Sequence, residues 1–179
     1  MNLFQASLIT GILLTVVGGM LTRPKSNFRL ACLRFPRSKL CSIWFIGIAT
    51  TWFLWRHVLF LSEADFGNYK LLIGGVAIGV ALLSFVYAAD FLAVRGWAML
   101  VLLFSREVLD AAFLQDAQSR LVLVSIVYFF IVAALYFGAW PYRMRDLIEW
   151  LNRKPGRMEV LGSVILISGL LTSALSFIY

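Results

Sequence analysis

The chain has 179 residues, of which 61% are hydrophobic and 14% are charged. A soluble domain contains roughly 45–50% apolar residues and about 25% charged residues. A globule of this length buries too little of its surface to hide the excess in a core. The composition therefore excludes an ordinary soluble fold and predicts an integral membrane protein.

The net charge of +7 comes from 16 lysine and arginine residues against nine acidic ones. The basic residues flank apolar runs and form no domain of their own, so we expect no nucleic-acid partner and instead contacts with anionic lipid headgroups. The two cysteines, Cys32 and Cys41, match neither a zinc pattern nor a redox motif. A single histidine, His57, excludes most two-histidine cofactor sites. We therefore expect no metal and no cofactor.

Six apolar runs are long enough to cross a bilayer, for which a helix needs about 20 residues. They cover residues 4–21, 40–61, 71–89, 97–114, 121–140 and 160–178. The sequence predicts an all-α, polytopic integral membrane protein in which residues 1–179 form one membrane domain. Trp52 and Trp55 lie deep in the second run, where we expect them to pack between helices.

Small residues recur at helical spacing in several of these runs. Such a face lets another helix backbone approach closely, which is how spans associate without a hydrophobic driving force. The first span, the third span and the last span each have one, at Ser7, Gly11, Thr15, Gly18 and Thr22, at Gly75 and Gly79, and at Gly162, Gly169 and Ser173.

The connections at 23–39 and 141–159 are basic and have apolar residues at helical spacing. Each predicts a short amphipathic helix in the plane of the membrane interface. Pro36 should end the first of these helices, and Pro155 with Gly156 should end the second. We expect their basic side chains to contact lipid headgroups: Arg23, Lys25, Arg29, Arg34, Arg37, Lys39, Arg143, Arg145, Arg153, Lys154 and Arg157.

The six spans are expected to form three helical hairpins, at residues 3–61, 71–114 and 121–179. An internal repeat supports this unit, since Trp44 and Phe60-Leu61 recur without a gap as Trp97 and Phe113-Leu114. An acidic residue, Glu63 or Asp116, follows two positions after each leucine. The positive-inside rule places the three basic hairpin loops in the cytoplasm and both termini outside, in a bacterial-type inner membrane.

Charged residues inside the fourth span need an explanation, because one charge at bilayer depth costs about 2.5–3.5 kcal/mol on the mildest scale. Arg106 and Asp110 are four residues apart on one helix face, and Glu107 lies beside Arg106. The repeat places Arg56 and His57 of the second span at a similar depth. We predict an intramembrane network of these five residues in which Arg56 balances the carboxylate that Arg106 leaves over.

The network has two interpretations, a salt-bridge clamp between helices or a proton- or ion-handling site. No phosphate-binding glycine loop, His-Glu-x-x-His motif or phosphatidyl-transfer motif is present, so we do not expect an enzyme. The sequence favours a non-enzymatic scaffold or accessory subunit with a membrane-protein partner or a second copy of itself. The alternatives are a small transporter or ion-conducting protein that uses the fourth-span charges, and a lipid-modifying enzyme with His57 and Asp110 as acid and base.

Overall fold

The computed structural model describes residues 1–62, 66–115 and 118–177. Within these ranges the chain forms eight α-helices and no strand, which confirms the all-α prediction. In chain order they are α1 (Leu3–Thr22), α2 (Ser26–Arg34), α3 (Lys39–Phe53), α4 (Lys70–Tyr87), α5 (Leu92–Ala112), α6 (Arg120–Ala139), α7 (Pro141–Arg153) and α8 (Pro155–Ser176). The predicted acidic turn residues Glu63 and Asp116, and the end of the last predicted span at Ile178, lie outside the described residues.

Four of the described helices are long and apolar enough to span a membrane, at residues 3–22, 67–87, 120–139 and 156–176. The chain thus has the helices of a multi-pass membrane protein. The other two predicted spans differ from these four. Helix α3 has 15 residues and continues into the π-helical turn η2 (Leu54–Val58), whereas α5 has 21 residues but carries the charged group.

Two predicted boundaries are wrong. The fourth span is predicted to begin at residue 97, but helix α5 begins at Leu92, directly after Phe91 with φ 58°, so most of the segment 90–96 between the third and fourth predicted spans is helical. Pro155 does not stop a helix but begins α8, while the extended Lys154 separates it from α7. Proline suits a first helical position because the amide hydrogen that it lacks would have no partner there. Helices α7 and α8 therefore meet at a one-residue corner.

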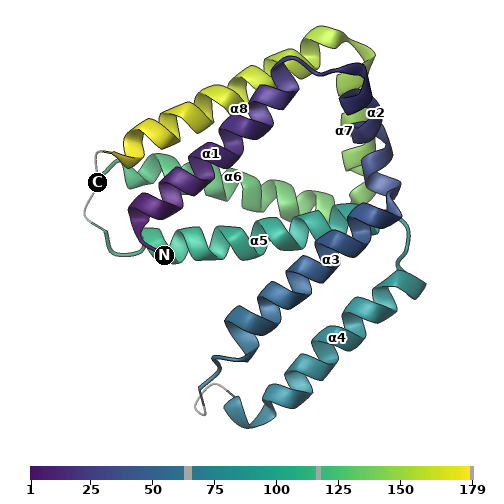
Figure 1. Ribbon diagram of the computed structural model, residues 1–179, viewed down its shortest axis with the longest axis vertical. Coiled ribbons are helices and arrows are strands. Elements are labelled where there is room, and N and C mark those ends of the chain that lie inside the picture. Colours follow the sequence, from purple (N-terminus) through teal and green to yellow (C-terminus); the bar gives the residue numbers. More distant parts are fainter. Residues whose placement is uncertain (63–65, 116–117, 178–179) are drawn as a thin grey trace.

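Helices α1 and α8 pack against each other along their length (Figure 1). Their glycines face the partner backbone: a Cβ on Gly18 would meet the backbone nitrogen of Leu166, and one on Gly162 would lie 2.5 Å from the backbone nitrogen of Thr22. A Cβ on Gly169 would lie 2.5 Å from the backbone nitrogen of Thr15. The small faces predicted for the first and last spans thus meet each other.

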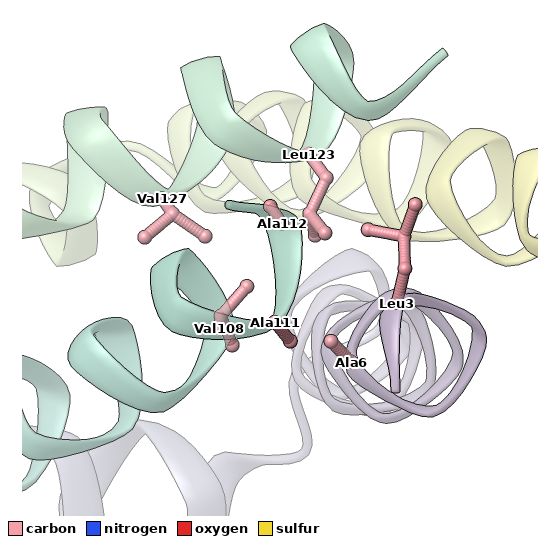
Figure 2. Packing of buried hydrophobic residues seen from close by; sticks show 7 residues of the cluster. All are labelled: Leu3, Ala6, Val108, Ala111, Ala112, Leu123 and Val127. Carbon is pink, nitrogen blue, oxygen red and sulfur yellow. The ribbon is translucent and has the colours of Figure 1, made fainter. Parts of the chain in front are cut away.

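The buried core lies where the N-terminal end of α1 meets the C-terminal half of α5 and the start of α6. Figure 2 shows side chains from all three helices in contact at this point. They are small or β-branched apart from two leucines, so the helices approach closely. The cluster consists of Leu3, Ala6, Val108, Ala111, Ala112, Leu123 and Val127.

The main helix pairs do not follow the predicted hairpins at 3–61, 71–114 and 121–179. Helix α1 pairs with α8, and α5 pairs with both α6 and α3, so each of these pairs joins two different predicted hairpins. In the first and third predicted hairpins, the interfacial helices explain why the two spans do not pair. At about 1.5 Å per residue, the nine residues of α2 and the 13 of α7 hold the spans on either side of them apart.

The basic connections gather at one end of the helices, and the two termini lie at the other end (Figure 1). Helix α2 contacts α7, and the short turn η1 (Phe35–Arg37) contacts both α5 and α7. Helices α3 and α4 extend away from the other spans as a pair, with α4 touching mainly α3 and η2. The structure therefore has a packed body and an open α3–α4 pair.

Adjacent glycines of α1 provide a matched test of the α1–α8 contact. In Gly18→Ala the new methyl group meets the Leu166 backbone, and overpacking of this kind costs about 1–3 kcal/mol of unfolding free energy. In Gly19→Ala the nearest atom is a Leu166 side-chain carbon at 4.0 Å. We expect thermal unfolding in mild detergent, followed by circular dichroism, to show a lower Tm for Gly18→Ala alone. Equal Tm values for the two variants would contradict the packing.

Candidate functional site

The site begins where α3 widens into the π-helical turn η2. There the backbone N–H of Leu59 donates to the carbonyl of Leu54 at 3.0 Å, a bond that spans five residues instead of four. Such turns occur mostly as single insertions in α-helices, often at functional sites. The turn carries Arg56 and His57 against α5, whereas Trp55 is 67% exposed and does not pack between helices as predicted.

Arg56 forms the strongest contact of the site. Its Nε donates to Glu107 Oε1 at 2.9 Å, which ties η2 to α5. The Glu107 side chain is only 13% exposed, while that of Arg56 is 52% exposed. A largely buried carboxylate needs a bonded cation to offset its desolvation. The pair therefore acts as an interhelical tie, and it is the pairing expected for the carboxylate that Arg106 leaves over.

Arg106 contacts the other two residues of the predicted network, His57 and Asp110. Its Nη1 lies 3.2 Å from Nδ1 of His57, and its Nε lies 3.9 Å from Asp110 Oδ2. Because a guanidinium can only donate, Nδ1 must be the acceptor, and the ring is neutral with its proton on Nε2. That Nε2 is buried and has no hydrogen-bond partner among the described residues. The five predicted residues thus form two sets of contacts, Arg56 with Glu107 and Arg106 with His57 and Asp110.

The two ion pairs of α5 differ in strength. Arg106 and Asp110 are 62% and 68% exposed and too far apart for a hydrogen bond, so their pair is loose. At about 1.5 Å per residue, Asp110 lies roughly 3 Å from the end of α5 at Ala112. Asp110 is therefore close to the interface, and the long side chain of Arg106 can extend toward the interface from one turn further in, which lowers the cost of both charges. The cluster therefore combines one tight tie with one open pair.

An apolar groove of about 410 Å³ lies beside the cluster, between α3, α4 and α5. Thr50 and Ser84 supply its two hydroxyl groups, and the Ser84 hydroxyl already donates to the carbonyl of Ala81. The groove was not predicted, because its walls come from three helices whose pairing the sequence does not show. The remaining lining residues are Ile46, Ala49, Phe53, Ala77, Val80, Ala81, Met99, Leu102 and Leu103.

Several predicted headgroup ligands are held by the protein itself. The guanidinium of Arg157 lies 4.0 Å from the ring centre of Trp150 and donates to the Trp150 carbonyl, and Arg37 lies 5.4 Å from the ring centre of Phe91. Arg145 pairs with Asp146 at 2.7 Å and with Glu149 at 3.6 Å. These contacts orient the basic side chains around α2 and α7. The Arg145–Glu149 pair follows from its spacing, whereas the two ring contacts do not.

The described residues include no group of three histidine, cysteine or acidic side chains that could hold a metal ion. No family model, no curated protein and no solved structure matches this chain.

Double-mutant cycles measure the two ion pairs directly. For Arg56→Ala and Glu107→Ala we expect a coupling free energy of about 1–3 kcal/mol, since either single change strands a partly buried charge. For Arg106→Ala and Asp110→Ala we expect less than about 0.5 kcal/mol, the usual value for an exposed helical pair. Unfolding in mild detergent supplies both values. A larger coupling in the second cycle would contradict this ranking.

Proposed function

We propose that the protein is a non-enzymatic scaffold or accessory subunit of a membrane complex, with α4 as the helix that binds the partner. The main support for this proposal is the exposure of α4, an apolar helix in which Gly74 is the one buried residue. Its contacts are mainly with α3 and η2 on one side. The opposite side is left for lipid or for another protein.

The open face of α4 has the residues that membrane helices use to associate. Leu72, Gly75, Gly79, Leu82 and Val86 share one face by their helical spacing. Among the described residues, no other helix has an atom within 4 Å of a Cβ built on Gly75 or Gly79. On α1 and α8, by contrast, a Cβ on Gly11, Gly18, Gly162 or Gly169 would meet the partner helix. The same kind of small-residue face is thus filled in the body of the protein and unfilled on α4.

The alternative, a small transporter that uses the α5 charges, receives less support. Arg56 contacts Glu107 and His57 contacts Arg106, so that two contacts join η2 to α5 as a structural clamp requires. An ion pathway needs polar groups along its length. The groove beside the cluster, as far as the described residues define it, has only two hydroxyl groups among apolar side chains. The charges therefore support a clamp between α3 and α5 better than a conduit.

We further infer six membrane crossings, adding α3 with η2 and α5 to the four apolar spans. An even number agrees with the two termini lying at one end of the helices and the basic connections at the other (Figure 1). The positive-inside rule then supports a multi-pass protein of the cell inner membrane with α2 and α7 on the cytoplasmic surface and both termini outside. Anionic headgroups are the expected ligands of that surface.

Purification in mild detergent tests the partner proposal. We expect the tagged wild-type chain to elute with a bound membrane protein or a second copy, and Gly75→Leu with Gly79→Leu to elute alone because leucine side chains block close approach. Gly47→Leu is the control, since Gly47 lies on α3 and a Cβ there also has no neighbour within 4 Å in the part of the chain that the structure describes. Native mass spectrometry identifies the species. A wild-type chain free of bound protein, or a double variant that keeps its partner, would refute the proposal.

Cysteine labelling in intact cells tests the orientation. In a background with Cys32→Ser and Cys41→Ser, we expect Gln118→Cys to react with a membrane-impermeant thiol reagent. Ser26→Cys should react only after the cells are permeabilised, because the basic connections are retained in the cytoplasm. Both positions are exposed, so access to the thiol is not limited by the protein. The reverse labelling pattern would overturn the orientation.

A further inference from the structure

We propose that the groove between α3, α4 and α5 binds an acyl chain of one zwitterionic phospholipid, whose phosphate and ammonium groups are held by Arg106 and Asp110. Arg106 and Asp110 lie in the C-terminal half of α5, whereas Arg37 of the basic surface packs on Phe91, directly before the N-terminal end of that helix. The headgroup site is therefore distinct from the general attraction of the basic surface for anionic lipids.

The groove has the size and lining that a hydrocarbon chain requires. Its volume of about 410 Å³ falls in the range of about 300–1,000 Å³ that is typical of ligand sites. An acyl chain in the groove would make van der Waals contacts with its apolar walls. It is shaped by the α3–α4 pair, which contacts the rest of the protein mainly through α5. A fixed chain in this position would fill space that protein side chains leave open.

The polar groups stand at one end of this groove. On α5, Leu102 and Leu103 line the groove and precede Arg106 by four and three residues, which places all three on one helix face. On α3, Phe53 lines the groove, and its ring centre lies 5.7 Å from that of His57. A molecule with its chain in the groove would thus have its head beside Arg106.

The charges favour a zwitterionic head over an anionic one. Glu107 is taken up by Arg56 at 2.9 Å, whereas Arg106 and Asp110 are both more than 60% exposed and 3.9 Å apart. An exposed cation beside an exposed anion matches a phosphate linked to an ammonium group, as in phosphatidylethanolamine. An anionic lipid such as phosphatidylglycerol would satisfy Arg106 but leave Asp110 next to a second negative charge.

Native mass spectrometry of the delipidated protein tests this site, with phosphatidylethanolamine and phosphatidylglycerol of identical chains as the probes. We expect the wild-type chain to retain one phosphatidylethanolamine with about a fivefold preference, the ratio that one partly exposed ion pair supplies. Ala81→Trp fills the groove and should abolish retention. Its neighbour Leu82 is 65% exposed and outside the groove, so Leu82→Trp should retain the lipid.

The headgroup assignment has its own variants, Arg106→Gln and Asp110→Asn. Arg106→Gln should weaken binding of both lipids, and Asp110→Asn should remove the preference between them. Circular dichroism confirms that each variant is folded before binding is measured. Undiminished binding to folded Ala81→Trp would overturn the groove as the site. A wild-type chain that prefers phosphatidylglycerol, or an unchanged preference in Asp110→Asn, would overturn the headgroup assignment.

Discussion

The direct backbone contact between α1 and α8 is the constraint on which the arrangement of the other helices depends. Because lipid is as apolar as the helices, only close packing and polar contacts can favour one pairing over another. Glycines on both helices make that packing possible, and it brings the two ends of the chain together. The N-terminal turns of α1 then complete the core with α5 and α6.

The α3–α4 pair is attached to this body by different means. Helix α3 packs on α5, where a Cβ on Gly96 would lie 2.8 Å from Phe45 Cβ. At the C-terminal end of α3, where the π turn η2 follows, the Arg56–Glu107 ion pair joins this segment to α5 in place of close backbone packing. Among the described residues, helix α4 has neither a glycine that meets another helix backbone nor an ion pair to α5, and it makes few contacts. The protein thus combines a closed body with an open edge at α4.

The sequence predicted the features that depend on local periodicity. The all-α class and the small faces on α1 and α8 follow from helical spacing. Helical spacing and the repeat also pointed to Arg56, His57, Arg106, Glu107 and Asp110, whose role as one network stays a prediction. Helical spacing does not identify the partner of each face, because a row of glycines indicates that another helix can approach closely but not which helix it is. The same holds for the groove, whose walls come from three helices.

Other features depended on single residues that have no distinct pattern. The π turn at Leu54–Val58 adds one residue to a helical turn, and an apolar run shows no sign of it. Phe91 allows α5 to begin early by taking a positive φ that is uncommon for a bulky residue. Proline is common both after the end of a helix and at its first position. Pro155 takes the first position of α8 because Lys154 before it has an extended backbone.

Cysteine cross-linking tests the central claim, that α1 pairs with α8 and not with the next span along the chain. The rings of Phe4 and Phe177 lie 5.8 Å apart between centroids, and Leu59 is the exposed residue at the end of η2 that a sequential hairpin would bring near Phe4. In the Cys32→Ser and Cys41→Ser background, a bifunctional thiol reagent with a short spacer, applied to membranes, should join Phe4→Cys to Phe177→Cys within one chain. It should leave Phe4→Cys with Leu59→Cys unjoined. The opposite result would show that sequential hairpins, and not the closure of α1 on α8, build the protein.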